Sequence, residues 1–370
     1  MNRILTLCFI LAASLAFGQV FTNKEVGKKN EDLIDSLKQA EYPFVLPIWG
    51  DKATKLGYNL PYSAGLSAQY FWAESDILID NLSVGFNNGP MYNLDGIIRF
   101  DVAKSEASSF TLRPDVWLFP FLNIYGILGK SQASTRVGFG IWVPNDDGTE
   151  SEIAEATTTV EFNTTTFGLG FTPTIGVGGG FLALDMNVAW TDVPQLAQPA
   201  RSFVFGPRFG KNFKLKKPER SVAIWAGGFR VDIRGETNGS LPLSDVVDPG
   251  FGQKIDDAQQ GVADRQEQVD DWWSSLTPPE QANPVNKARY ELANSTLERA
   301  GEILAAAETA VDNIENSSVQ YSMDKQVKDR WNFIVGGQFQ LNKHFMVRLE
   351  YGFLGSRTQI ITGVQYRFGL

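Results

Sequence analysis

The chain has 370 residues, 43% of them hydrophobic, with one Cys, one His and a net charge of −9. One Cys allows no intramolecular disulfide or thiolate zinc site, and one His excludes sites that need two imidazoles. The negative charge argues against a non-specific nucleic-acid binder, which needs a basic surface to displace counterions. We therefore expect no metal site, no cofactor and no nucleic-acid partner.

Residues 1–18 have the features of a secretory signal peptide. Arg3 precedes the apolar run Ile4–Phe17, and Ala16-Phe17-Gly18 has the small-x-small pattern that signal peptidase cuts. The run is shorter than the roughly 20 residues that a spanning helix needs. We expect cleavage after Gly18, which removes the only Cys and leaves an exported mature protein.

The segment 19–59 predicts a separate N-terminal unit on the periplasmic side. It contains a possible helix at Lys29–Ala40 and then the Pro-rich apolar stretch Tyr42–Gly50, which is a poor strand. Two arrangements are open for this segment: a partial plug in the mouth of the domain that follows, or packing against its rim.

From about residue 60 the dominant pattern is a period of two, which is typical of strands. A soluble sandwich and a transmembrane barrel both alternate in this way. The segments are ten or more residues long, where soluble strands average about five or six, and Trp and Tyr recur near their ends, as in interfacial girdles. These features favour an all-β, transmembrane antiparallel β-barrel over residues 60–370. We expect about 12 strands, at 62–73, 78–87, 91–104, 107–118, 122–143, 157–173, 178–191, 200–212, 220–235, 327–341, 343–354 and 358–370.

The predicted strand ends imply two different ends of the barrel. With both termini in the periplasm, the connections on that side are short: 88–90, 119–121, 174–177, 213–219 and 342. The opposite, extracellular side receives the two long connections, 144–156 and 236–326. Short periplasmic turns and longer outer loops are typical of bacterial outer-membrane barrels.

The 236–326 insertion changes to helical periodicity. Apolar residues recur three, four or seven positions apart from Ile255 to Leu276 and again from Leu297 to Ile314. Thr277-Pro278-Pro279-Glu280 predicts a capped helix start, and Asn283-Pro284 a second one. We expect an α-helical hairpin in an extracellular loop. The insertion holds 17 acidic and 6 basic residues, so the acidity of the chain belongs to it; a solvated face, a cation-dependent cap or a docking surface would each explain this.

The last strand resembles the C-terminal targeting signature of bacterial outer-membrane barrels. Gly363, Tyr366 and Phe368 match the signature, whereas the added Gly369-Leu370 and the apolar Ile361 depart from it. The resemblance implies recognition by the barrel assembly machinery and contact with outer-membrane lipid.

Polar residues on the face opposite the predicted lipid-facing side chains are candidates to line the lumen. They either line a solute path or pair across the lumen and close it. The candidates are Asp185, Asn187, Arg230, Asp232, Arg234, Gln338, Gln340, Arg348 and Glu350.

The sequence offers little support for catalysis. A Ser-His hydrolase would have to use His344, which the topology places at a periplasmic turn, away from an outer-leaflet substrate. We therefore expect no catalytic residues. Asn145–Glu150, with Glu152 and Glu155, could ligate calcium, but the spacing does not match an EF-hand loop.

Over most of its length the chain is similar to a family of uncharacterised outer-membrane β-barrel proteins of Gram-negative bacteria. The segments that carry the similarity are Leu46–Asp51, Phe119–Gly126, Asp271–Pro278 and Trp331–Gln338. The resemblance implies location in the outer membrane but no solute. Three function classes stay open: a channel or transporter for small solutes, which we expect first; a structural or adhesive surface protein that presents the helical insertion; and an envelope lipid hydrolase.

Overall fold

A computed structural model describes residues 31–39, 41–177, 179–193, 199–217, 219–234, 238–247 and 250–370. The side chains of residues 32–34, 37, 233, 234 and 325 are not described. The predicted signal peptide 1–18 lies outside the described residues.

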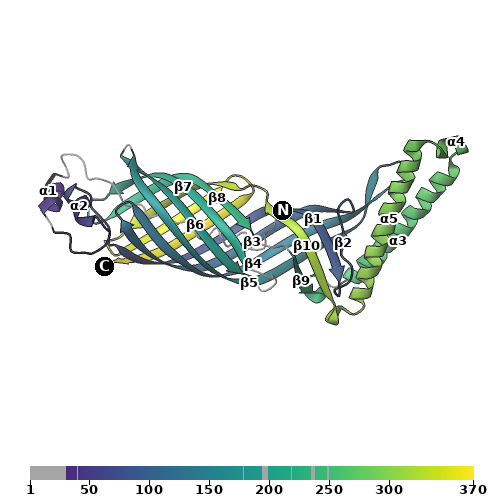
Figure 1. Cartoon of the computed structure of the whole chain (residues 1–370), viewed down its shortest axis with the longest axis horizontal. Coiled ribbons are helices and arrows are strands. Elements are labelled where there is room, and N and C mark those ends of the chain that lie inside the picture. Colours follow the sequence, from purple (N-terminus) through teal and green to yellow (C-terminus); the bar gives the residue numbers. More distant parts are fainter. Residues whose placement is uncertain are drawn as a thin grey trace.

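The main body is a closed antiparallel β-barrel of ten strands (Figure 1). Each strand pairs with the next around the barrel, and β13 closes the ring on β1 with a register that runs from Ala64↔Phe368 to Ser75↔Arg357. In order, the strands are β1 (Ala64–Phe86), β3 (Ile98–Phe119), β4 (Leu122–Pro144), β5 (Glu150–Val177), β6 (Gly180–Asp192), β7 (Ala200–Lys214), β8 (Ser221–Arg234), β11 (Trp331–Gln340), β12 (Phe345–Phe353) and β13 (Arg357–Phe368).

The predicted number of about twelve strands differs from the observed ten because two strands were divided in the prediction. Predicted strands 62–73 and 78–87 are the single strand β1, and 107–118 continues 91–104 in β3. The polar runs Glu74–Asp76 and Ser105–Glu106 were taken as breaks, but they continue the ladder as pairs between β1 and β3. The connection at 88–90, predicted to be periplasmic, therefore lies at the opposite end of the barrel.

The two ends of the barrel differ in what they carry (Figure 1). The end with the C-terminus has only short connections between barrel strands, and we call it the terminal end. The other end, the hairpin end, carries the long insertion. Four strands, β1 and β3 to β5, have 22 to 28 residues, whereas β12 has 9. A 28-residue strand extends about 90 Å, so these strands project far beyond the closed ring.

The projecting parts form a sheet extension together with three further strands: β2 (Tyr92–Asn93), β9 (Asn238–Pro242) and β10 (Ser318–Val327). β10 pairs with β1, and β9 with β10. β9 and all but the last residue of β10 lie inside the segment 236–326 that the sequence assigned to the helical insertion, and they were not predicted.

The predicted helical hairpin is present. Its helices are α3 (Phe251–Ser275), the short α4 (Pro278–Gln281) and α5 (Pro284–Val311), with 3-10 turns η3 (Leu243–Asp245) and η4 (Ile314–Asn316) on either side. The Glu280 carboxylate accepts hydrogen bonds from the Thr277 backbone N–H at 2.8 Å and from its hydroxyl at 2.6 Å. These bonds lower the pKa of Glu280. Asn283 caps α5 by accepting from the Val285 N–H at 2.9 Å. Both predicted helix starts are therefore confirmed.

Two N-terminal helices, α1 (Glu31–Gln39) and α2 (Gly50–Lys55), lie beyond the terminal end of the barrel (Figure 1). The Pro-rich stretch between them contacts the rim: the Ile48 N–H donates to the Leu118 carbonyl at 2.9 Å, and the Trp49 ring lies 4.9 Å from that of Phe119. These contacts are with the rim of the barrel. Of the described helices, none is long and apolar enough to cross a membrane.

Candidate functional site: the closed lumen

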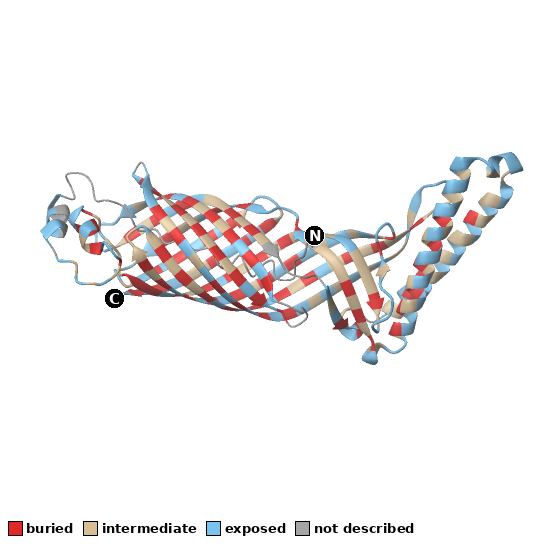
Figure 2. Cartoon of the chain, viewed as in Figure 1, coloured by how far each residue is buried: buried red, intermediate tan, exposed pale blue. Residues whose placement is uncertain are grey.

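The outer face of the barrel is apolar around its terminal half. Large hydrophobic side chains point outward from every barrel strand, in alternation with inward, buried ones, which produces the checkerboard in Figure 2. Exposed members include Leu66, Phe110, Leu128, Phe167, Trp190, Phe209, Ile224, Phe339, Leu349 and Tyr366. A water-soluble protein rarely exposes a continuous apolar surface of this kind.

The outer face of β8 changes from apolar to polar toward the hairpin end, while the same alternate residues face inward along the strand. Ile224 is 53% exposed on the outer face, but further along the strand Phe229 and Val231 are buried inside. Arg230 and Asp232 point outward and pair with each other at 2.9 Å. Their predicted place in the lumen is therefore wrong. The prediction assumed an apolar outside along the whole strand, whereas here the outside is polar and the inside apolar; the Arg234 side chain is outside the described part.

An apolar layer fills the barrel interior on the hairpin side. Phe71, Phe162, Phe229, Ile334 and Ile361 belong to one buried cluster, to which strands on all sides of the ring contribute. Each of these side chains is at most 5% exposed. This layer packs across the lumen, where a water-filled channel would need an open, polar path.

A polar network fills the terminal half of the lumen, and its centre is Glu350. Arg208, on β7 and three strands away around the ring, donates from Nε at 2.8 Å and from Nη2 at 3.0 Å to the two Glu350 oxygens. Trp225 Nε1 donates to the same carboxylate at 2.8 Å, and Arg348 Nη2 lies 3.6 Å from it. Two-point contacts of this type fix both partners in position.

A second carboxylate, Asp185, extends the network. Its Oδ1 accepts hydrogen bonds from Tyr125 Oη at 2.7 Å and Thr172 Oγ1 at 2.6 Å. Arg208 Nη1 and Arg113 Nη2 lie 3.8 and 3.9 Å from its two oxygens. The Arg113 guanidinium also stacks over the Tyr125 ring at 3.3 Å. Asp185 thus connects side chains from five barrel strands.

A third carboxylate, Asp115, lies nearest the terminal end. Arg367 Nη1 lies 3.1 Å from Asp115 Oδ2, Gln365 Nε2 donates to Oδ1 at 2.6 Å, and Asn123 Nδ2 donates to Oδ2 at 2.9 Å. All four residues are buried. The three carboxylates and their partners, which we call the lumen network, join opposite walls of the barrel.

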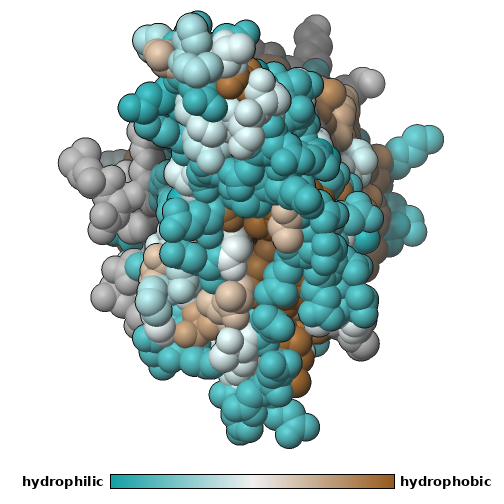
Figure 3. All heavy atoms as spheres, turned by 90° about the vertical axis from the view of Figure 1, so that its right-hand side faces the viewer, coloured by the Kyte–Doolittle hydropathy of each residue, from teal (hydrophilic) through white to brown (hydrophobic). Residues whose placement is uncertain are grey.

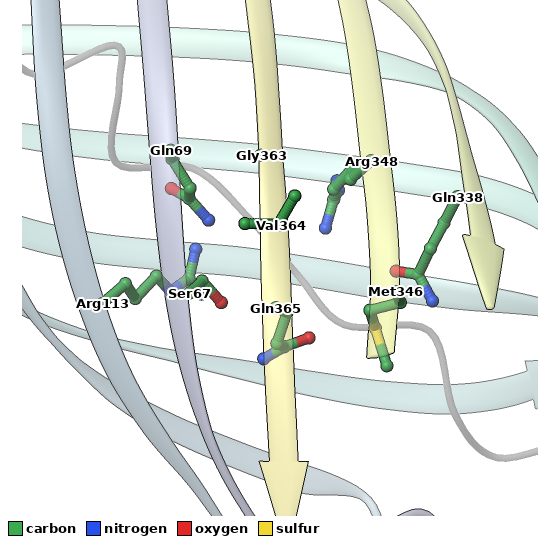
Figure 4. A pocket seen from close by; sticks show the side chains of 9 residues that line it. All are labelled: Ser67, Gln69, Arg113, Gln338, Met346, Arg348, Gly363, Val364 and Gln365. Carbon is green, nitrogen blue, oxygen red and sulfur yellow. The ribbon is translucent and has the colours of Figure 1, made fainter. Parts of the chain in front are cut away.

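A small cavity remains beside the lumen network (Figure 4). Gln69 and Arg113 point into it from one side of Gly363, and Arg348 from the other. The space open to a water-sized molecule is about 20 Å³, and one water needs roughly 10–15 Å³. The cavity therefore has room for about one water-sized molecule or ion.

The structure brings together five of the predicted lumen residues: Asp185, Asn187, Gln338, Arg348 and Glu350 are all buried inside the barrel. Gln340, two residues after Gln338 on β11, is half-buried. The sequence reasoning missed Arg113, Asp115, Arg208 and Arg367. Arg367 lies between the outward Tyr366 and Phe368, and Arg208 lies between Pro207 and Phe209. Apolar neighbours on both sides of an arginine in a strand could therefore have predicted that it faces inward.

His344 and the acidic turn at 145–150, the other candidates from the sequence, make contacts within the protein. His344 lies at the turn between β11 and β12 at the terminal end, with Nδ1 2.8 Å from the Arg367 carbonyl and its ring against Tyr62 and Tyr366. In the acidic turn, the Asp147 carboxylate accepts from the Thr149 N–H at 2.8 Å, and the bonds from Thr149 lower the pKa of Asp147. Within the described residues there is no group of three potential metal-ligating side chains.

The helical hairpin is fixed to the sheet extension by a continuous apolar seam. Val143 of β4 and Ile97 pack with Val269 of α3 and Leu297 of α5. A second cluster joins α3 and α5 to Phe86 and Ile141. Figure 3 shows the molecule from the hairpin end, where most of the visible surface is hydrophilic.

The chain matches no protein-family model and no curated protein. Solved structures with a similar shape include the β domain of the Bordetella autotransporter BrkA, at 11% identity and a TM-score of 0.33, covering 83% of this chain and 100% of that one. Others are an outer membrane channel from Pseudomonas putida, at 10% identity and 0.29 with 83% and 96% coverage, and the translocator domain of the autotransporter NalP from Neisseria meningitidis, at 8% and 0.32 with 83% and 89% coverage. These proteins are outer-membrane β-barrels.

Proposed function

We propose that this protein is an outer-membrane barrel with a closed lumen, which anchors the sheet extension and presents the helical hairpin at the cell surface. The filled interior of the barrel is the main support for this proposal. Among the described residues, an apolar layer and the lumen network fill the interior in series and leave a solute no continuous aqueous path. The geometry therefore favours a structural or adhesive surface protein over the channel that the sequence led us to expect first.

The apolar outer band supports insertion in a membrane. β11 and β12 have 10 and 9 residues, which matches the roughly 9–11 residues of a tilted membrane-spanning strand. The change from apolar to polar outward residues at Arg230 and Asp232 then marks the level at which the outer face meets water. With the terminal end in the periplasm, β1 and β3 to β5 continue past this level and carry the hairpin away from the membrane.

The hairpin has the properties of a presented element. Its apolar seam holds it on the sheet extension, while the remaining surface carries most of the acidity of the chain. Val285 and Leu292 of α5 are 73% and 66% exposed, which leaves apolar contact points for a partner among the acidic residues.

Epitope display on intact cells tests the proposed orientation. An epitope inserted after Ala282, between α4 and α5, should bind antibody on intact cells. A matched insertion after Asn342, in the turn at the terminal end, should bind only after the outer membrane is permeabilised. Binding of the Asn342 epitope on intact cells, with none at Ala282, would reverse the orientation and contradict surface presentation.

A further inference from the structure

The buried charges of the barrel interior do not balance. Within the lumen network, four arginines, Arg113, Arg208, Arg348 and Arg367, face three carboxylates, Asp115, Asp185 and Glu350. The buried Arg357 lies apart from them, toward the hairpin end, where Nη2 donates to the Asp329 carbonyl at 3.2 Å. The lumen network thus carries one excess positive charge. A buried net charge is costly unless a counter-charge compensates it.

The ion-pair distances differ among the four arginines. Arg367 Nη1 lies 3.1 Å from Asp115 Oδ2, and Arg208 donates to Glu350 at 2.8 and 3.0 Å. Arg348 shares Glu350 at 3.6 Å, and Arg113 shares Asp185 at 3.9 Å. The two arginines that share a carboxylate with Arg208 are therefore Arg113 and Arg348.

Arg113 and Arg348 are also the two charged residues that line the cavity. Figure 4 shows them approaching it from opposite sides, with the amides of Gln69, Gln338 and Gln365 around it. Gly363 leaves the space between them open: a Cβ at this position would lie 2.8 Å from Gln69 Cγ. None of the described residues that line the cavity carries a carboxylate.

From this geometry we propose that the cavity binds one small monovalent anion, of the size of chloride, between Arg113 and Arg348. The anion neutralises the excess charge and accepts hydrogen bonds from guanidinium and amide groups. The volume of about 20 Å³ selects a single small ion and excludes larger organic anions. The bound ion stabilises the closed lumen, since it binds the folded barrel and not the unfolded chain.

Thermal unfolding of the detergent-folded barrel at constant ionic strength tests this proposal. Replacing gluconate, which is too large for the cavity, by chloride should raise the unfolding midpoint by a few degrees, and Arg348→Gln should abolish the increase. Arg357→Gln, which removes a buried arginine away from the cavity, is the matched control and should retain the increase. An equal midpoint in both anions, or loss of the effect in both variants, would overturn the proposal.

A second measurement does not depend on the variants. Crystals of the unaltered protein grown in bromide should give an anomalous peak in the cavity between Arg113 and Arg348. Density for water alone at that position would reject the anion site.

Discussion

Single residues in the lumen network affect the stability of the barrel strongly, because their charges are buried and shared. Glu350 is fully buried and contacts Arg208, Arg348 and Trp225. Removing one member of a buried ion pair leaves the other charge uncompensated, which costs about 3–5 kcal/mol. The same change at a partly exposed pair costs about 0–1 kcal/mol.

We therefore expect Glu350→Gln to lower the free energy of unfolding by about 3–5 kcal/mol, since the charges of Arg208 and Arg348 lose their shared carboxylate. The measurement is urea unfolding of the folded barrel, followed by Trp fluorescence. Asp232→Asn is the control, because its partner Arg230 lies on the outer face with its side chain 38% exposed. Similar losses in the two variants would mean that Glu350 is not held in a dry network.

At the scale of elements, the sequence predicted the strands and helices better than the side on which each residue lies. The hairpin caps at Thr277 and Asn283 were predictable because capping depends on local residues. The orientation of Arg230 was not predictable from the sequence, because it depends on whether that part of β8 lies inside or outside the apolar outer band. The prediction divided β1 at Glu74–Asp76 for the same reason: beyond the apolar band, polar residues replace apolar ones on the strand, although the chain makes no turn there.

The lumen network could be predicted only in part for a related reason. Arg348 and Glu350 alternate with outward apolar residues on β12, so the strand pattern places them inside. Which arginine meets which carboxylate depends on contacts across the ring, such as Arg208 with Glu350, 142 positions apart. Periodicity within one strand carries no information about such pairs.

The C-terminal strand supports a prediction about assembly. Tyr366 and Phe368 are 43% and 40% exposed on the outer face of β13, available to another protein before the barrel closes. We expect the double variant Tyr366→Ala, Phe368→Ala to reduce folded protein in the membrane several-fold, measured as the fast-migrating band of unheated samples. Phe339→Ala, also on the outer face but on β11, is the control and should assemble normally. Equal assembly of all three proteins would remove the role of the C-terminal aromatics.

The helical hairpin supports a second prediction at this scale. Leu297 is 1% exposed in the seam between α5 and the sheet extension, whereas Leu292 on the same helix is 66% exposed. We expect Leu297→Ala to destabilise the docking of the hairpin by about 2–5 kcal/mol, through the cavity that it leaves. Limited proteolysis should then release the hairpin faster, with barrel migration unchanged. Leu292→Ala should behave like the unaltered protein; equal cleavage of both variants would show that the seam does not hold the hairpin.

At the scale of the whole molecule, the three parts follow one another along the length of the barrel (Figure 1). The N-terminal segment contacts the rim at the terminal end, the barrel interior is filled, and the longest strands carry the hairpin at the far end (Figure 1). The filled interior separates this arrangement from that of a channel, in which the lumen is the functional part. Whether the lumen conducts is therefore the most informative property of the molecule.

Single-channel recording of the refolded protein in a planar lipid bilayer shows whether the lumen conducts. We expect no stable conductance steps from the unaltered barrel. The variant Phe71→Ser, Phe229→Ser, Arg208→Ser, Glu350→Ser, which removes the bulk of the apolar layer and the central ion pair, should give small steps and so show that the protein inserts. Stable, ohmic steps from the unaltered protein, with the hairpin present, would contradict the closed lumen and restore the channel interpretation.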